Sequence, residues 1–305
     1  MNILLVADEA TGLQAAIRIL NSHHNLTAIL TQPDSTTGLN MSRLARNAGV
    51  EVFPSSRVSN PHFATWMTTH NVDVLLNVHS LHLICKGVIQ SLNVGAFNLH
   101  PGPLPQYAGL NAPSWAIYNQ EKTHAVTLHE ITSVIDAGDI LYETTFPLTE
   151  TDTGRSVSLA CSHHGIKLVD QFLQDLSEGS NLPNRKAQDL SHRRIYKRAT
   201  IPNHGNIQWS QTAKEISAFV RASYYSPFVS PWGIPQTRFL DHIISIFALE
   251  ISTIPSNKPP GTIDCSENGT ISVATRDQWV ILTSWLLDGK TLSDRPPFQK
   301  GDQLQ

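Results

Sequence analysis

The sequence predicts an α/β protein with a doubly wound, mostly parallel sheet, followed by a small β domain. Two patterns lead to this fold class. In the first half of the chain, short continuous apolar runs alternate with helical segments, as in parallel strands joined by helices. Beyond residue 240, short strand-like runs separated by turns replace that alternation, which is typical of a small β-barrel. A chain of 305 residues is long enough for both domains.

The strands of the first domain are expected where several apolar residues follow one another. They cover residues 3–7, 26–31, 50–53, 72–78 and 97–100. The helices between them are expected at residues 12–20, 40–47 and 61–70. Gly49 closes the second of these helices, and Pro61 stands near the start of the third, where proline is well tolerated.

A long amphipathic helix is expected over residues 153–176, and we expect it to cover the sheet. Its predicted apolar face consists of Leu159, Ile166, Leu168, Val169, Phe172 and Leu173. Residues 177–184 are polar and rich in turn formers, which indicates a linker. The predicted domains are therefore residues 1–180 and 205–305, joined by a linker over residues 181–204.

The second domain is expected to begin with a helix at residues 213–222, followed by a proline-rich loop. Strand-like runs come after it at residues 243–251, 270–275 and 279–287. The residues from 293 onward are polar and are expected to be frayed.

Composition limits the classes of function. Forty per cent apolar and fifteen per cent charged residues are typical of a soluble globular protein, and a net charge of −3 gives no general attraction to nucleic acid. The cysteines Cys85, Cys161 and Cys265 are far apart, which favours buried or incidental thiols in a reducing compartment. The histidine pairs have no carboxylate or cysteine at metal-ligand spacing, so no metal site is predicted.

The first residues suggest location and exclude one cofactor class. They lack a basic leader and a run long enough to span a bilayer, so a cytoplasmic protein is expected. After the first strand, Gly12 stands alone instead of in a Gly-x-Gly-x-x-Gly motif. A dinucleotide cofactor is therefore not expected.

Asn98 and His100 stand two residues apart near the end of an apolar strand. On an extended segment both side chains emerge on one face, while Leu99 points to the other. Three prolines within the next five residues cannot continue a sheet ladder, so the strand is expected to end directly after His100. Ligands of open α/β sheets bind beyond the carboxyl ends of the strands, so this pair marks a candidate site.

A second strand after residue 125 leads to Asp136, which adds a carboxylate from a later loop. Such a trio suits attack of an amine on an acyl carbon: the amide donates to the oxyanion, and the imidazole moves protons. The carboxylate orients the imidazole ring. Structural explanations remain open, because Asn-x-His is often a hydrogen-bonded pair and Asp-Ala-Gly is also a turn sequence. The combination, with a proline-rich loop between, favours chemistry.

These motifs resemble those of the formyltransferases that use 10-formyltetrahydrofolate. That family includes methionyl-tRNA formyltransferase, glycinamide ribonucleotide formyltransferase and the sugar N-formyltransferases. The matching motifs are Asn98-x-His100, Leu104-Pro105-Gln106-Tyr107-Ala108-Gly109, Val126-Thr127 and Asp136-Ala137-Gly138. The resemblance covers most of the chain. It implies a Rossmann-like catalytic domain, a C-terminal OB-like domain and formyl transfer to a primary amine.

The resemblance also implies roles for individual residues. Asn98 and His100 are expected to bind the formyl carbonyl, and Asp136 to hold His100 and to help pass the amine proton to the leaving folate nitrogen. The residues implied for the folate pocket are Leu81, Leu83, Ile84, Pro105, Ile135 and Asp139. The residues implied for the acceptor are Tyr107, Gly109 and His129. The first three pocket residues are equally compatible with the start of the next helix, and His129 with a structural role.

The acceptor is defined less closely than the reaction. No long basic insertion resembles the one with which the tRNA enzyme grips its acceptor stem, and the stretch from Arg221 to Pro235 resembles formyltransferases of non-ribosomal peptide or polyketide assembly. The basic cluster at residues 192–198 is either a solvated surface or a contact for a phosphopantetheine arm, a nucleotide or RNA. We expect a small-molecule, sugar-nucleotide or carrier-bound aminoacyl acceptor.

Other classes of function predict different behaviour. A methionyl-tRNA formyltransferase would use aminoacyl-tRNA as acceptor, and a formyltetrahydrofolate hydrolase would release formate without any amine. A folate-binding or carrier-docking module would bind ligand without turnover, which the intact trio disfavours. The sequence does not predict the oligomeric state.

Overall fold

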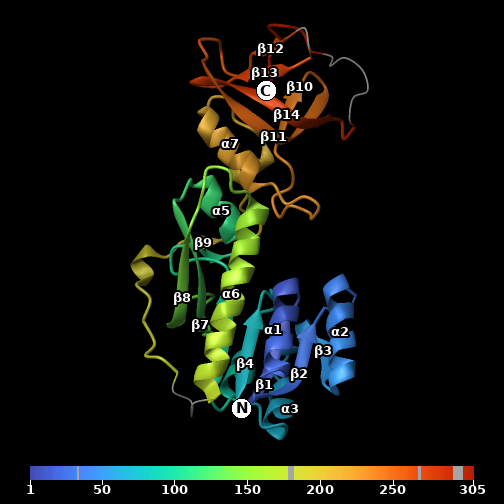
Figure 1. Ribbon diagram of the computed structural model, residues 1–305, viewed down its shortest axis with the longest axis vertical. Coiled ribbons are helices and arrows are strands. Elements are labelled where there is room, and N and C mark those ends of the chain that lie inside the picture. Colours follow the sequence, from blue (N-terminus) through green and yellow to red (C-terminus); the bar gives the residue numbers. More distant parts are fainter. Residues whose placement is uncertain (33, 178–181, 267–268, 291–297) are drawn as a thin grey trace. The chain divides into compact units, whose positions relative to one another are not determined.

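The computed structural model describes residues 1–305 apart from residues 33, 178–181, 267–268 and 291–297. The described chain forms two compact units, whose segments interleave along the sequence (Figure 1). The first unit comprises Met1–Gly109, His124–Phe146 and Leu159–Ile195, and the second comprises Leu110–Thr123, Pro147–Ser158 and Tyr196–Gln305. The linear division at residues 180 and 205 stays a prediction.

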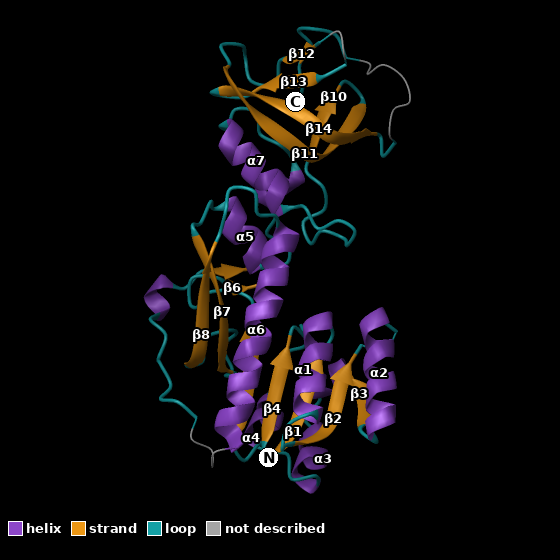
Figure 2. Ribbon diagram, viewed as in Figure 1, coloured by secondary structure: helices purple, strands orange, loops and turns teal. Residues whose placement is uncertain are grey.

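Within the described residues, a seven-stranded sheet organises the first unit, in the order β3-β2-β1-β4-β5-β7-β8 (Figure 2). Its strands are β1 (Asn2–Ala7), β2 (Asn25–Thr31), β3 (Glu51–Pro54), β4 (Val74–Val78), β5 (Gly95–His100), β7 (Thr123–Glu130) and β8 (Ile140–Pro147). The neighbours from β3 to β5 run parallel, and β7 pairs antiparallel with β5. The prediction of a mostly parallel sheet is confirmed.

Helices join the parallel strands, as continuous apolar strands require. They are α1 (Ala10–Leu20), α2 (Thr36–Ala48), α3 (Phe63–Thr69) and α4 (Lys86–Gln90), with the 3₁₀ turn η1 (Ser55–Ser59). The Ser35 side chain accepts the backbone N–H of Gly38 at 2.9 Å, and this cap starts α2 at Thr36 rather than at residue 40. Gly49 ends α2 with a φ of 69°, as predicted.

One face of the sheet is buried under α3 and α4. Leu4, Val6, Leu30 and Leu75 point from their strands into a core that also contains Phe63 of α3. Burying a side chain of this size contributes about 1.5–3 kcal/mol relative to exposure in water. This core holds the parallel strands rigidly, so their carboxyl ends form a fixed edge.

The predicted long helix is α6 (Gly154–Ser177), and its residues from Leu159 onward belong to the first unit. It packs against β5, where the rings of Phe172 and Phe97 lie 4.9 Å apart. A Cβ atom on Gly165 would lie 2.8 Å from Leu99 Cδ2, so the glycine allows α6 to approach the strand closely.

The predicted apolar face of α6 is wrong at Leu159, whose side chain is 56% exposed. Leu168, Val169, Phe172 and Leu173 are buried, and Ile166 is half-buried. Leu159 precedes Leu168 by nine residues, which at 3.6 residues per turn is about two and a half turns. The two side chains therefore point to opposite sides of the helix.

The second unit contains an antiparallel sheet in the order β10-β11-β14-β13-β12 among the described residues. Its strands are β10 (Gln236–Phe239), β11 (His242–Pro255), β12 (Ile263–Cys265), β13 (Ile271–Ala274) and β14 (Gln278–Leu287). The unit also holds α5 (Ala112–Tyr118) and α7 (Ala213–Ala222), and α7 begins with a capping box formed by Thr212 and Glu215. The predicted C-terminal OB-like β domain is confirmed as an antiparallel half-barrel.

The described end of the chain is ordered on this sheet, so the prediction of fraying is wrong for residues 298–305. Leu304 is buried, and its N–H donates to the carbonyl of Gly261 at 2.9 Å. Arg238 and Gln305 exchange two backbone hydrogen bonds. These long-range pairings leave no signature in a polar sequence. Residues 293–297 lie outside the described residues.

The segment predicted as a linker has local structure. It contains η2 (Leu190–His192), β9 (Ile195–Tyr196) and η3 (Pro202–Gly205). Strand β9 pairs with β6 (Ala108–Gly109), which ends the proline-rich loop. This pairing connects two segments that are more than 80 residues apart.

Candidate active site

Asn98 and His100 lie at the carboxyl end of β5, and the strand ends at His100 as predicted. His100 is only 3% exposed, and Asn98 is half-buried. Leu99 between them is buried on the opposite face, against α6. The alternation of a strand thus puts the amide and the imidazole together on one side of the sheet edge.

The His100 ring is fixed by a hydrogen bond at one nitrogen, and its other nitrogen faces Asp136. Nε2 lies 2.7 Å from the backbone carbonyl oxygen of Tyr107, and because a carbonyl only accepts, Nε2 carries the hydrogen. Nδ1 therefore holds the lone pair of the neutral ring, and it lies 3.7 Å from Asp136 Oδ2. Burial lowers the pKa of His100 below its ordinary value, while Asp136 opposes this by favouring the charged ring.

Asp136 reaches the same place from the loop between β7 and β8. Its Oδ2 accepts the backbone N–H of Gly109 at 2.7 Å, and its Oδ1 accepts from Asn98 Nδ2 at 3.4 Å. Burial raises the pKa of Asp136, but His100, His129 and the Gly109 N–H together hold the pKa well below its usual range. The carboxylate is therefore ionised beside the imidazole.

The amide of Asn98 has one orientation that satisfies its neighbours. Its Oδ1 accepts from Asn77 Nδ2 at 2.8 Å, so its Nδ2 faces His129 Nε2 at 3.0 Å and Asp136. Asn77 lies opposite Asn98 in the parallel pairing of β4 and β5. Asn77 is not among the site residues predicted from the sequence, although a polar residue inside the apolar run 72–78 is the signal that marks it.

His129 supports this arrangement from β7. Its Nδ1 donates to the carbonyl oxygen of Glu130 at 2.7 Å, and its Nε2 lies 3.0 Å from Asn98 Nδ2. Nε2 also lies 3.4 Å from Asp136 Oδ1. His129 is 1% exposed, and its Nε2 contacts two members of the trio, Asn98 and Asp136. The predicted contact of His129 with an acceptor stays a prediction.

The residues expected to line the folate pocket fall into two groups. Leu81 and Leu83 follow β4 and are 61% and 67% exposed, whereas Ile84 packs against the core of the first unit. All three precede α4, which begins at Lys86, so they form a loop rather than the start of that helix. Two exposed leucines beside the strand end are an apolar surface without a partner among the described residues.

The other predicted site residues are spread over the two loops that meet at the trio. Pro105 is buried, Ile135 is 45% exposed and Asp139 is half-buried. Tyr107 and Gly109 take part through their backbones, as the acceptor for His100 and the donor to Asp136. Their predicted contacts with an acceptor substrate stay predictions.

The basic cluster is not uniform. Arg193 donates from Nη2 to the backbone carbonyl of Ile135 at 2.6 Å, immediately before Asp136 in the chain. Arg194, Lys197 and Arg198 are exposed. One member of the cluster therefore contacts the loop that carries the carboxylate, which sequence position alone does not indicate.

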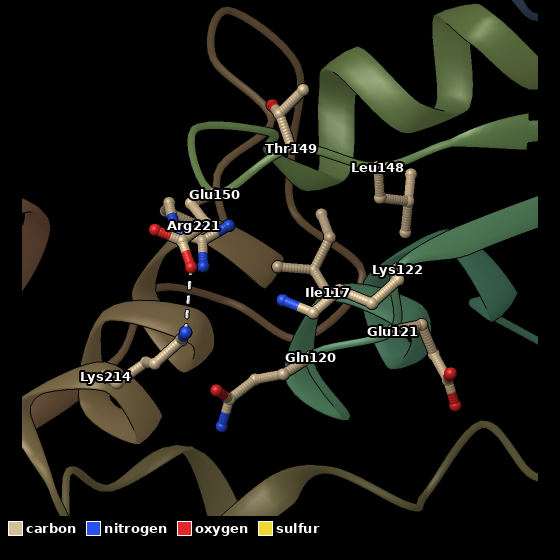
Figure 3. Close-up of a pocket in the computed structure, with 9 residues that line it drawn as sticks. All are labelled: Ile117, Gln120, Glu121, Lys122, Leu148, Thr149, Glu150, Lys214 and Arg221. Atoms are coloured by element: carbon tan, nitrogen blue, oxygen red, sulfur yellow. Dashed lines mark hydrogen bonds and ion pairs between the residues drawn. The ribbon is translucent and has the colours of Figure 1, made fainter.

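A separate cavity of about 30 Å³ lies within the second unit (Figure 3). It is lined by Ile117, Gln120, Glu121, Lys122, Leu148, Thr149, Glu150, Lys214 and Arg221. Lys214 pairs with Glu150 at 2.8 Å, and Arg221 donates to the backbone carbonyl of Asp152 at 2.7 Å. Its volume suits a water molecule rather than a substrate.

Other chemistries receive little support from the described residues. Burial raises the pKa of the Cys161 thiol, so this group is a poor nucleophile, and Cys85 and Cys265 are also free. Among the residues that the structure describes, no three histidine, cysteine or acidic side chains gather as a metal site would require. Each described helix is too short or too polar to cross a bilayer.

Comparison with known proteins defines the class. The family described as "Formyl transferase" matches residues 1–171, and "Formyl transferase, C-terminal domain" matches residues 201–302. The chain therefore belongs to the formyl transferase family, and the resemblance found in the sequence is confirmed.

Individual relatives match over most of their length. Methionyl-tRNA formyltransferase of Clostridium beijerinckii is 26% identical over 303 residues, which cover 96% of this chain and 94% of the relative. An N-formyltransferase from Helicobacter canadensis, solved with folinic acid and dTDP-3-aminofucose, matches with a TM-score of 0.68 and 17% identity over 92% of this chain and 99% of its own. The sugar 3N-formyltransferase WlaRD, solved with dTDP and 5-N-formyl-THF, has a TM-score of 0.68 and 15% identity, with 92% and 97% covered.

Proposed function

We propose that this protein transfers the formyl group of 10-formyltetrahydrofolate to a primary amine. The observation that carries the proposal is the convergence of three side chains at the carboxyl edge of the sheet: Asp136 lies 3.4 Å from Asn98 Nδ2 and 3.7 Å from His100 Nδ1. Membership of the formyl transferase family supports the reaction type. The folate compounds bound to the H. canadensis enzyme and to WlaRD support the identity of the donor.

The loop after β4 fits a folate. Leu81 and Leu83 offer exposed apolar surface, and Asn77 Oδ1 and Ser80 Oγ are buried without a hydrogen-bond partner among the described residues. A flat heterocycle with an apolar face and several donors and acceptors matches such a surface. We assign the binding of the pterin to this loop, and the donor supplies an activated formyl carbon when it is bound.

Asn98 is the candidate donor to the formyl oxygen. Its Nδ2 points to the side of the site that Asp136 occupies, and Asn77 prevents the amide from turning over. The bond from Nδ2 to Asp136 is long, at 3.4 Å, and the formyl oxygen takes the place of this acceptor in the proposal. Because the Asn98 amide is oriented before the reaction begins, its N–H stabilises the negative charge that develops on the formyl oxygen when the amine attacks. Donors of this kind contribute about 2.7–4 kcal/mol each to lowering the barrier.

His100 and Asp136 form the candidate proton acceptor. The neutral ring has its free lone pair on Nδ1, because Nε2–H is bonded to Tyr107, so the amine proton goes to Nδ1. The ionised Asp136 then stabilises the resulting imidazolium. The imidazolium gives this proton to the folate nitrogen as the bond from that nitrogen to the formyl carbon breaks, which leaves the formylated amine and tetrahydrofolate as products. The expected direct bond from His100 to the formyl carbonyl is replaced in this proposal by proton transfer, because Nε2–H is already used.

The acceptor that we propose is an amine on a small molecule, a sugar nucleotide or an aminoacyl group carried by a protein. The resemblance of the fold to two sugar N-formyltransferases supports a sugar nucleotide, and the methionyl-tRNA formyltransferase relatives make aminoacyl-tRNA the main alternative. A carrier protein as partner and a cytoplasmic location belong to this proposal as well.

Labelled 10-formyltetrahydrofolate tests the reaction. We expect label to pass to at least one amine in a panel of dTDP-amino sugars, aminoacyl carrier protein and methionyl-tRNA. Release of formate without any amine indicates a hydrolase instead. Folate binding with neither outcome contradicts catalysis and indicates a binding module. The acceptor with the highest kcat/KM names the substrate class.

A further inference from the structure

A segment predicted as a linker lies against both loops of the candidate site. We propose that residues 185–194, here called the strap, position Asp136 for catalysis, and that Gln188 is the residue through which they do so. This inference rests on the proposed function. It adds a positioning residue, which neither the sequence motifs nor the trio itself indicates.

The strap holds the Asp136 loop by its backbone carbonyls. Gln188 Nε2 donates to the carbonyl oxygens of Asp136 at 3.1 Å and Gly138 at 2.5 Å, so both amide hydrogens are used on one turn. Arg193 donates to the carbonyl of Ile135. Three of the four carbonyls from residue 135 to 138 therefore accept from strap side chains.

The turn that these bonds hold has an unusual conformation. Asp136 has a φ of 51°, in the left-handed region that non-glycine residues rarely adopt. A residue keeps this unfavourable backbone conformation only when contacts with the surrounding structure stabilise it, and residues in such conformations cluster at functional sites. The bonds from Gln188 and the Gly109 N–H constrain both the backbone and the carboxylate of Asp136.

The strap is itself anchored on both sides of the site. Lys186 exchanges two backbone hydrogen bonds with Ile140, and Arg185 pairs with Glu130 at the end of β7. At the other end, the Arg194 N–H donates to Pro105 and its carbonyl accepts from Ala108. Figure 1 shows this part of the chain in yellow, running beside β8. The Asp136 loop and the His100 loop are thus held by one continuous segment.

Positioning explains Gln188 better than stability alone. Its Oε1 is buried without a partner among the described residues, which costs roughly 1–3 kcal/mol in free energy of folding. A buried glutamine that served stability alone would have hydrogen-bond partners for both its amide oxygen and its amide nitrogen. In Gln188 only the amide nitrogen is hydrogen-bonded within the described part of the chain, and it donates to the backbone carbonyl of Asp136, whose side chain is the proposed catalytic carboxylate.

The test compares Gln188→Met with Gln278→Met in the full chain. Gln278 is a matched control, because it is also half-buried and donates from Nε2 to a backbone carbonyl, that of Ser252 in the second unit. We expect Gln188→Met to lower kcat about 10- to 100-fold with little change in the KM for folate, since small displacements of a catalytic group have effects of this size. Gln278→Met should retain wild-type kcat at a similar loss of stability.

The pH profile separates positioning from a general loss of structure. The charged or titratable groups that act on His100 are Asp136, His129 and His79, and His100 in turn acts on His124. Of these groups, only Asp136 is hydrogen-bonded to Gln188. If the carboxylate moves away, the pKa of His100 falls, and the acid limb of kcat moves to lower pH in Gln188→Met. A purely structural defect lowers kcat without moving that limb.

A second variant and a second readout keep the proposal open to refutation. Gln188→Glu has the same shape but lacks the two amide hydrogens, so it should behave like Gln188→Met. Amide hydrogen exchange over residues 135–139 should quicken in both variants, whether or not the acceptor is known. Wild-type kcat and exchange in both variants contradict the role of Gln188. If the wild-type protein itself transfers no formyl group, the proposed function fails instead.

Discussion

Asp136 Oδ2 lies 3.7 Å from His100 Nδ1 and, at the same time, 2.7 Å from the backbone nitrogen of Gly109. His100, His129 and this N–H group together lower the pKa of the Asp136 carboxylate in spite of its burial, and the N–H group fixes the oxygen in front of the imidazole. The relationship joins the end of β5, the proline-rich loop and the loop after β7. It brings the three segments together at the candidate site.

The first prediction concerns the charge of this unit. Asp136→Asn should retain folate binding and lower kcat about 100-fold or more, because it removes the group that stabilises the imidazolium. Turnover is measured with labelled formyl donor, and binding by titration with a non-reactive formyl folate. Asp170→Asn is the control, because Asp170 is exposed on α6 of the same unit and pairs with Arg18 at the surface. Wild-type turnover in Asp136→Asn would rule out the assigned role.

The second prediction concerns Asn77. Asn77→Ala removes the donor that orients the Asn98 amide, so the amide can present oxygen instead of nitrogen to the formyl group. We expect a loss of about 10-fold or more in kcat, within the effect of one oxyanion donor. Asn93→Ala is the control, because Asn93 bonds Asp73 at the surface of the same unit. Equal kcat in the two variants would show that Asn98 needs no such support.

The third prediction concerns stability and pH. Burial lowers the pKa of His124 to about 4, and its Nε2 donates to the Pro101 carbonyl at 2.9 Å. The unfolded chain takes up this proton below a pH of about 6.5, whereas the folded protein resists until a pH of about 4. The stabilising contribution is therefore complete above pH 6.5 and decreases as the pH falls toward 4.

Denaturant unfolding at pH 7.5 and 4.5 checks this. The wild-type protein should lose more free energy of unfolding between these pH values than His124→Gln, by about 2–3 kcal/mol. Burial also lowers the pKa of His100, so part of the dependence remains in the variant. Identical pH dependence in the two proteins would contradict a neutral, buried His124.

The fourth prediction concerns the end of the chain. Leu304→Ala should lower the free energy of unfolding by about 2–5 kcal/mol, because Leu304 is buried and its backbone pairs with Gly261. Leu240→Ala is the control, since Leu240 is 76% exposed, and its effect should stay within about 0.5 kcal/mol. Urea unfolding measures both. A negligible effect of Leu304→Ala would restore the view that the end of the chain is frayed.

Local pattern was enough for much of the site. The three prolines end β5 at His100, and the two-residue period of a strand places Asn98 on the same face. The alternation of apolar runs and helices likewise predicts the parallel sheet. These features depend on neighbours within a few residues, so a single sequence contains them.

Other features depend on contacts between distant segments. The face of α6 that excludes Leu159, the pairing of Leu304 with Gly261 and the orientation of Asn98 by Asn77 all require the folded chain. The same holds for Gln188, which follows Asp136 by 52 residues.

By itself, the sequence determined the order of the strands and helices of the first domain, the residue types of the site and the family to which the chain belongs. The tertiary structure alone decided which atoms of those residues face one another, and that the strap contacts the carboxylate loop. The physical reason is that hydrophobic period and proline act locally, whereas the direction of an amide or a carboxylate depends on partners from elsewhere in the chain.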